Sequence, residues 1–245
     1  MRFAVILLLL AGMLPAQDPT AGAAREQLER ELEAYRMVLM DYGGLTYYGS
    51  DNTELRRSPD VVFLGDEITE NWGKGKAKFF PGRNYLNRGI TRQTSAQMLV
   101  RFRQDVIDLK PKVVVIEAGS NDLARVLGPA SEGTVAEHFM SMMDLAKVHG
   151  IRVVLCSVTP VCDCAGKKMT AIRSAGRILA FNGWLKRFAA ENGAVYLDYY
   201  GALARGRAMN KDLTVDGFLP NDAGYEAMAP LAEKAIAGAM AEGAR

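Results

Sequence analysis

The sequence predicts an α/β protein in which a parallel sheet is covered on both faces by helices. Short apolar runs rich in β-branched residues, at 61–64, 113–116 and 153–156, alternate with longer segments whose apolar residues recur at helical spacing. Continuous apolar runs of this length are typical of strands that are buried on both faces, as in parallel sheets. The alternation of such strands with helices favours one layered α/β domain.

Composition supports a single globular domain. The chain has 245 residues, of which 49% are hydrophobic and 24% charged, which is sufficient for a sizeable core. The net charge is +2, and no run of Lys or Arg forms a basic tract. We therefore do not expect a nucleic-acid partner.

The N-terminus is typical of an export signal, and residues 1–16 are the expected signal peptide. Arg2 supplies a short positive start, and 3–14 form an apolar run that is short for a bilayer span. Ala16 offers a cleavage point, and no Cys follows for lipid attachment. An uncleaved anchor is the alternative. The mature protein is expected to be secreted or periplasmic, without a stable membrane anchor.

Residues 17–58 are expected to form an N-terminal helix and a linker packed on the domain, which occupies residues 59–245. The helix is predicted over 23–40, because apolar residues recur there at helical spacing and charges of opposite sign lie four residues apart. The apolar positions are Leu28, Leu32, Tyr35 and Leu39.

The domain itself continues as alternating strands and helices. Thr94 and Gln97 have the spacing of a capping box, which predicts a helix that Pro111 ends. Pro230 is expected to kink or break the terminal helix. The other elements expected are strands at 85–87 and 195–197 and helices at 134–148, at 172–192 and from 221 onward.

Glycine-containing polar segments follow three of the predicted strands. They are 65–67, Gly89 and 119–122. Because ligands of parallel sheets bind at the carboxyl ends of the strands, near a switch in strand order, we expect these segments to converge at one cleft.

Four segments then carry a specific resemblance. Val62–Trp72 contains Gly-Asp-Glu after a strand, Asn87–Ile90 contains a glycine, Gly119–Asp122 reads Gly-Ser-Asn-Asp, and Asp216–Asn221 has an aspartate three residues before Leu219. In this order, and on these elements, they are similar to the four sequence blocks of the SGNH (GDSL) ester-hydrolase family. The likeness extends from about residue 61 to the C-terminus.

The resemblance implies a three-layer α/β/α fold with a flavodoxin-like parallel sheet of about five strands. It also implies acyl transfer without a cofactor, in which a serine attacks an ester and a histidine takes its proton. Carried over, Gly89 and Asn121 would be oxyanion donors, Asp216 would orient the histidine, and Asp66 would be structural.

Two positions depart from the family pattern. Glu67 stands where the family has its nucleophilic serine, and Leu219 stands where it has its histidine. Attack by a carboxylate on an ester would give a less stable anhydride, and leucine cannot carry a proton. The two histidines, His138 and His149, fall on the helix between the third and fourth strands. Because loss of triad members removes most of the turnover, we expect no serine-type esterase activity.

Glu67 suggests a replacement role at the same place. It should lie at a helix N-terminus beside donors for an oxyanion, which favours a carboxylate. Our hypothesis is that its side chain folds into the oxyanion hole and accepts bonds from Asn121 and the Gly89 N–H. It would then mimic the acid product of the family's reaction.

The favoured function is therefore a non-catalytic protein that binds a small molecule of the acyl or carbohydrate ester class. Trp72, Arg88 and Arg92 are candidates to line its cleft. The alternative is an ester hydrolase of the carboxylesterase, lysophospholipase or carbohydrate acetylesterase type, acting through Glu67.

Two further alternatives use carboxylates. Asp66, Glu67 and Asp216 could hold a hard cation such as Ca²⁺, although no metal is the preferred expectation. Glu67 and Asp216 could instead act as an acid–base pair on a glycosidic bond. Ser95 and Ser120 are interpreted as structural hydroxyls, since neither pairs with a general base by sequence.

Three cysteines could form one disulfide in an oxidising compartment. A pair between Cys156 and either Cys162 or Cys164 is expected rather than the short Cys162–Cys164 ring. A zinc site lacks ligands nearby.

Overall fold

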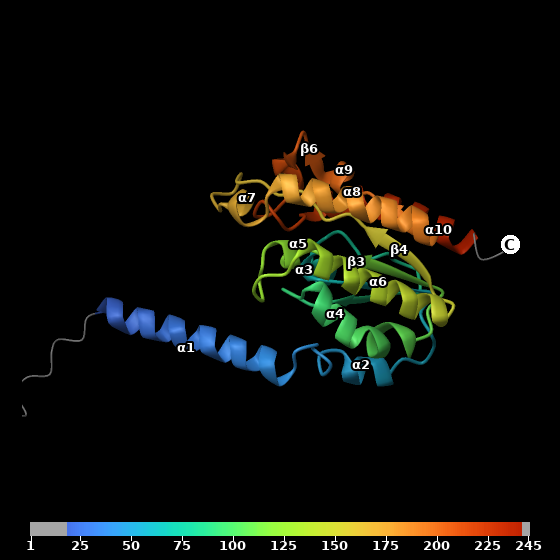
Figure 1. Cartoon of the computed structure of the whole chain (residues 1–245), viewed down its shortest axis with the longest axis horizontal. Coiled ribbons are helices and arrows are strands. Elements are labelled where there is room, and N and C mark those ends of the chain that lie inside the picture. Colours follow the sequence, from blue (N-terminus) through green and yellow to red (C-terminus); the bar gives the residue numbers. More distant parts are fainter. Residues whose placement is uncertain (1–18, 242–245) are drawn as a thin grey trace, which may run out of the picture. The chain divides into compact units, whose positions relative to one another are not determined.

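The protein contains a five-stranded parallel sheet with helices on both faces, which confirms the predicted three-layer fold (Figure 1). The computed structural model describes residues 19–241. The strands lie in the order β2-β1-β3-β4-β5, so the strand order reverses between β1 and β3. The strands are β1 (Val61–Gly65), β2 (Tyr85–Gly89), β3 (Val113–Glu117), β4 (Arg152–Cys156), β5 (Val195–Leu197) and a small antiparallel pair, β6 (Ala204–Arg205) with β7 (Ala208–Met209).

The helices follow the predicted alternation. They are α1 (Pro19–Met40), α2 (Gly49–Thr53), α3 (Glu67–Asn71), α4 (Ser95–Phe102), the π-helical η1 (Arg103–Ile107), α5 (Ser120–Leu123), α6 (Glu132–Val148), α7 (Met169–Ile172), α8 (Ala175–Asn192), α9 (Tyr199–Leu203), the 3-10 helix η2 (Lys211–Leu213) and α10 (Asp222–Ala241). The expected signal peptide lies outside the described residues. Within 19–241, no helix is both long and apolar enough to cross a membrane.

If the crossovers between parallel strands have the usual right-handed form, α4, α6 and α8 lie on one face of the sheet and α3 on the other, where α10 joins it. The contacts agree with this arrangement. The rings of Phe139 on α6 and Phe181 on α8 lie 5.7 Å apart. On the opposite face, the Tyr225 hydroxyl on α10 donates to the carbonyl oxygen of Ile68 on α3 at 2.8 Å. The sheet is therefore covered on both sides.

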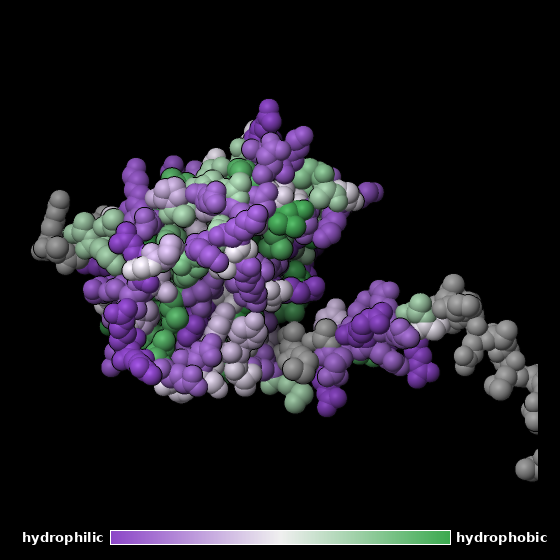
Figure 2. Space-filling model, turned by 180° about the vertical axis from the view of Figure 1, so that it is seen from behind, coloured by the Kyte–Doolittle hydropathy of each residue, from purple (hydrophilic) through white to green (hydrophobic). Residues whose placement is uncertain are grey.

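The core is centred on β1 and β3, in which every residue is buried. On the face shown in Figure 2, hydrophilic residues cover most of the α/β unit, and hydrophobic residues show only in small areas. Trp72 belongs to the core, because it is 4% exposed and its ring packs against those of Phe63, Phe80 and Tyr225. The expectation that Trp72 lines a cleft is therefore wrong.

Two helices differ from their predicted form. The helix expected over 172–192 begins at Ala175 instead, because Arg173, between α7 and α8, leaves the helical conformation with φ −119° and ψ 83°. The terminal helix α10 continues through Pro230 without a break. The capping box of Thr94 and Gln97 at the start of α4 is present as predicted.

The chain divides into two compact units. Helix α1 belongs to the first, and the α/β unit begins at Gly43 rather than at the predicted residue 59. The segment after Gly43 is tied to the sheet by side chains, since Gln93 Nε2 donates to the Gly43 carbonyl at 2.9 Å and Tyr48 OH donates to the Gly89 carbonyl at 2.6 Å. The packing of α1 on the domain stays a prediction.

A buried arginine connects the elements that lead to the carboxyl ends of the strands. Arg101 on α4 is 0% exposed and donates to the carbonyl oxygens of Gly65 and Arg88, which lie near the ends of β1 and β2. Its guanidinium also pairs with Asp105 at 2.9 Å and donates to Gln93 at 2.6 Å. A buried charge is tolerated only when it is paired and hydrogen-bonded in this way.

Replacing Arg101 by leucine should therefore be costly. We expect Arg101→Leu to lower the free energy of unfolding by about 3–5 kcal/mol, because Asp105 loses its charged partner inside the protein. The measurement is urea unfolding. Arg103→Leu is the matched control, since Arg103 is exposed and lies 3.9 Å from Asp108; its effect should stay within about 1 kcal/mol. Equal effects of the two substitutions would contradict this account.

Candidate functional site

The site lies at the carboxyl ends of β1 and β3, at the reversal of strand order where parallel sheets bind their ligands. Glu67 is the first residue of α3, directly after β1, and Asn121 lies in α5, which follows β3. Asp66 caps α3, because its Oδ1 accepts from the Ile68 N–H at 2.9 Å. The segments after these two strands thus converge as predicted.

The Glu67 carboxylate occupies two hydrogen-bond donors of the site. Its Oε2 accepts from Asn121 Nδ2 at 2.8 Å and from the backbone N–H of Arg92 at 2.7 Å, and the residue is 8% exposed. The expected bond from Asn121 is confirmed. The expected bond from Gly89 is wrong, because the Gly89 N–H donates to Asn87 Oδ1 at 2.9 Å.

Gly89 has a packing role at this point. A Cβ at Gly89 would lie 2.1 Å from the backbone nitrogen of Glu70, so any side chain would displace α3 from the end of β2. Such a close approach of two backbones requires glycine. The Arg92 backbone, with φ +65°, supplies the second donor to Glu67 instead, while its own side chain is exposed.

Arg173 is a site residue that the sequence analysis missed. It is 7% exposed, and its Nη2 donates to Asn121 Oδ1 at 3.0 Å while its Nε donates to Ser120 Oγ at 3.0 Å. The guanidinium lies 4.1 Å from the centre of the Phe218 ring. The break between α7 and α8 directs Arg173 inward. The only sequence signal was the Ser174–Gly176 segment, which weakens the helical pattern there.

Charges at the site act on Arg173 in both directions. Burial lowers the pKa of the Arg173 guanidinium, and the nearby carboxylates of Glu67, Asp66 and Asp216 oppose that change. The same guanidinium places a positive charge beside the Glu67 carboxylate. The site is therefore a buried arrangement of opposite charges that Asn121 connects.

Behind Glu67 lies a pair of buried carboxyl groups, on Asp66 and Glu117. Burial raises the pKa of Glu117 to about 7. Burial also raises the pKa of Asp66 well above its ordinary value, and the nearby charge of Glu117 raises it further. The side chains of Asp66 and Glu117 are hydrogen-bonded to each other, and the Thr69 hydroxyl donates to Glu117 Oε2 at 3.4 Å. The other oxygen, Glu117 Oε1, is buried and has no hydrogen-bond partner among the described residues.

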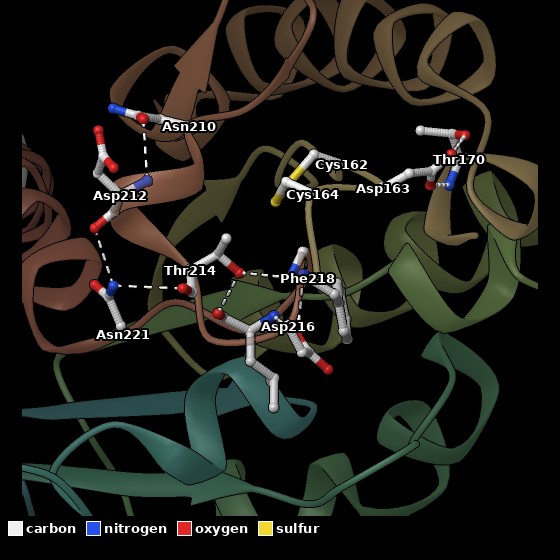
Figure 3. Close-up of a disulfide and its surroundings, with 12 residues drawn as sticks. Cys162, Asp163, Cys164, Thr170, Asn210, Asp212, Thr214, Asp216, Phe218 and Asn221 are labelled. Carbon is white, nitrogen blue, oxygen red and sulfur yellow. Dashed lines mark hydrogen bonds between the residues drawn. A yellow bond between two sulfur atoms is a disulfide. The ribbon is translucent and has the colours of Figure 1, made fainter. Parts of the chain in front are cut away.

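The last block keeps its aspartate in a different role (Figure 3). Asp216 Oδ1 accepts from the backbone N–H groups of Phe218 at 3.1 Å and Leu219 at 2.9 Å, and its Oδ2 pairs with Lys167 Nζ at 3.1 Å. Burial acts to raise the pKa of Asp216, but these bonds outweigh it and the pKa is lowered. Leu219 packs against the core and brings no proton acceptor to the site.

Arg88 also serves the fold. Its guanidinium donates twice to Asn52 Oδ1, at 2.9 and 2.7 Å, and lies 4.4 Å from the centre of the Tyr48 ring. It is 3% exposed. The expectation that Arg88 lines a cleft is therefore wrong, because the residue attaches the segment after Gly43 to β2.

A hydroxyl and an imidazole do meet beside the site, on Ser95 and His138. Ser95 Oγ lies 2.8 Å from His138 Nδ1 and donates to Asp122 Oδ1 at 2.6 Å. The expectation that no general base pairs with Ser95 is therefore wrong. Ser95 is nevertheless 0% exposed and stands between His138 and Asp122, whereas a triad places the imidazole between hydroxyl and carboxylate. The arrangement is structural, as is Ser120, which accepts from Arg173.

The disulfide joins Cys162 to Cys164. The expected pairing with Cys156 is wrong, because Cys156 ends the buried strand β4 and points into the core, where burial raises the pKa of its thiol. Within residues 19–241, no three or more His, Cys, Asp or Glu side chains are arranged to hold a metal ion. The carboxylates proposed for Ca²⁺ have separate partners: Asp66 has Glu117, Glu67 has Asn121, and Asp216 has Lys167.

Comparison with known proteins identifies the family. The model of the GDSL-like Lipase/Acylhydrolase family matches residues 63–227, which include three of the blocks discussed above and all of the first except Val62. The chain belongs to this family. The GDSL-like fold is also that of a GDSL-like lipase from Bacteroides thetaiotaomicron, which is 36% identical, with a TM-score of 0.75 over 81% of this chain and 99% of the other.

Two further relatives are matched over shorter stretches. The uncharacterized lipoprotein YqeF of Bacillus subtilis is 33% identical over 46% of this chain and 54% of its own length. A platelet-activating factor acetylhydrolase IB subunit beta homolog of Drosophila melanogaster is 32% identical over 33% of this chain and 37% of its own length. The chain thus spans about half or less of these curated relatives.

The buried carboxyl pair predicts a pH dependence. The ordinary pKa of Glu117 is 4.5 and its folded pKa is about 7, so between these values the folded protein holds a proton that the unfolded chain has lost. Stability therefore falls as pH rises through this window. The measurement is urea unfolding of the unaltered protein and of Glu117→Gln at a series of pH values. We expect the difference between their free energies of unfolding, unaltered protein minus variant, to fall from pH 4.5 to 7. Glu137→Gln, at an exposed position of α6, is the control and should give a flat difference. A flat difference for Glu117→Gln as well would contradict the assignment.

Proposed function

We propose that this protein is a non-catalytic, ligand-binding member of the GDSL-like family. The observation that carries the proposal is the position of the Glu67 carboxylate, which accepts from Asn121 Nδ2 at 2.8 Å and from the Arg92 N–H at 2.7 Å. In the family pattern, the residue at the position of Asn121 donates to the oxygen on which the reaction develops negative charge. Here that place is taken by an oxygen of the protein itself.

The absence of an activated nucleophile supports the same conclusion. Glu67 stands at the nucleophile position, and Leu219 stands where the family pattern has its base. Asp216, which would orient that base, is bound to backbone N–H groups and to Lys167. Neither Ser95 nor Ser120 offers a free hydroxyl, since each is buried and hydrogen-bonded to charged side chains.

The proposed ligand is a small molecule of the acyl or carbohydrate ester class. The backbone N–H of Arg92 binds Glu67, and the Arg92 side chain is exposed, so it is the candidate contact for such a ligand at the surface beside Glu67. Export to the periplasm or the medium is part of the proposal and is supported by the signal-like residues 1–16. The nearly balanced charge favours neither a nucleic acid nor a membrane surface as partner.

Removing the Glu67 carboxylate should uncover an anion site. We expect acetate to raise the melting temperature of Glu67→Ala but not of the unaltered protein, because the Asn121 amide, the Arg92 N–H and the Arg173 charge become available. At ten times its Kd, acetate would add about 1.4 kcal/mol of stability. Glu137→Ala, which removes an exposed carboxylate on α6, is the control and should show no acetate effect. An equal response of all three proteins would argue against the occupied site.

Restoring both missing groups should restore chemistry. We expect Glu67→Ser combined with Leu219→His to hydrolyse p-nitrophenyl acetate at least ~100-fold faster than either single variant, because triad members act as a unit. The measurement is release of p-nitrophenolate, with the unaltered protein as baseline. Clear hydrolysis by the unaltered protein, abolished in Glu67→Ala, would instead establish an ester hydrolase acting through Glu67.

A further inference from the structure

The disulfide of the α/β unit joins two cysteines in unlike surroundings. Cys162 is buried, at 6% exposure, whereas Cys164 is exposed. Both lie in the loop that follows β4 and precedes α7 (Figure 3). One sulfur of the pair is therefore open to a reagent in solution, and the other is enclosed by the protein.

This disulfide is placed poorly for a framework role. It spans a sequence separation of 2. The stabilisation that a disulfide gives by restricting the unfolded chain grows with the logarithm of the loop it closes, so the shortest loops gain least. Exposed disulfides are also the ones that exchange with thiols. Lys167 and Lys168 follow within four residues of Cys164, and positive charge of this kind favours a thiolate.

Asp163, the residue between the cysteines, is connected to the Glu67 site through helix α7. The Asp163 carboxylate accepts from the backbone N–H of Thr170 at 2.8 Å and from its hydroxyl at 2.7 Å, which fixes the first turn of α7. Helix α7 ends at Ile172, and the next residue is Arg173, which holds Asn121. The conformation of the loop that holds the two cysteines therefore affects the position of the Arg173 backbone.

A second connection runs through the loop of the last block. The Cys162 N–H donates to the Gly217 carbonyl at 2.8 Å, and a Cβ at Gly217 would lie 2.2 Å from the Cys162 carbonyl oxygen. The next residue, Phe218, presents its ring to the Arg173 guanidinium at 4.1 Å. Both routes from the disulfide therefore end at the same guanidinium.

We propose that the Cys162–Cys164 disulfide is a thiol-exchange site whose opening releases Arg173 from Asn121. The thiolate of a small thiol attacks Cys164 Sγ, a bond forms between the two sulfurs, and the Cys162–Cys164 bond breaks. The electron pair goes to Cys162 Sγ, which takes up a proton. A second thiolate attacks the thiol's sulfur in the mixed disulfide and liberates Cys164; in sum, two thiols are oxidised to their disulfide and the protein disulfide is reduced.

Without the disulfide, Asp163 is no longer held in the ring that Cys162 and Cys164 close. Its carboxylate then no longer has a fixed position from which to bind Thr170 in the first turn of α7. Arg173 then leaves Asn121, while the bonds between Glu67, Asn121 and the Arg92 N–H stay in place because they come from α3, α5 and the segment before α4. The exchange is independent of whether the site hydrolyses an ester.

The first part of the experiment locates the attacked sulfur. The full chain is incubated with oxidised glutathione as the variant Cys162→Ser or Cys164→Ser, and adducts are measured by intact and peptide mass spectrometry. We expect glutathione to add to Cys164 in the first variant at least ~10-fold faster than to Cys162 in the second, because only Cys164 is accessible. Equal rates, or faster addition at Cys162, would overturn the proposal.

The second part follows Arg173 by hydrogen exchange. The unaltered protein is compared in its oxidised form and after reduction by glutathione, with Cys156→Ala as a control that keeps the disulfide. Reduction should speed amide exchange in residues 169–173 and 214–219 and leave β3 unchanged. The double variant Cys162→Ser with Cys164→Ser should match the reduced form without any thiol. Unchanged exchange in 169–173 would equally overturn the proposal.

Discussion

The Asn121 side-chain amide is the interaction on which the site depends. Its nitrogen donates to Glu67 at 2.8 Å and to the Gln93 carbonyl at 3.2 Å, and its oxygen accepts from Arg173 at 3.0 Å. One planar group thus joins the end of β1, the segment before α4 and the chain after α7. Because Asn121 is 0% exposed, its amide is most stable when all three partners are bound, and each lost partner leaves a buried polar atom to be satisfied in another way.

The fold could be predicted from the sequence because buried strands and amphipathic helices leave regular patterns, and the strand-end rule placed Glu67 and Asn121 together. Arg173 could not be predicted, since a break of one or two residues between helices has no periodic signal. Residue type also does not reveal direction: Trp72 faces the core, and Arg88 faces Asn52. Contacts of that kind depend on packing that only the folded chain defines.

The loop of the last block is held by hydrogen bonds of its own. Asp216 accepts two backbone N–H bonds and pairs with Lys167, while Thr214 Oγ1 donates to the Leu219 carbonyl at 2.7 Å. The turn thus has structural reasons to persist that do not involve catalysis. Asp216 therefore holds this turn whether or not a base stands at position 219.

Gly89 marks a place in this protein where no other residue can be accommodated. At that position two backbones touch, so there is no room for even a methyl group, and a substitution would move α3 itself. Positions 67 and 219, in contrast, differ from the family pattern by side chain alone. On the function proposed above, hydrolysis would be gained or lost by exchanging these two side chains, whereas the backbone contact at Gly89 leaves no room for any substitution. Divergence of activity within one unchanging scaffold is the evolutionary outcome that such geometry permits.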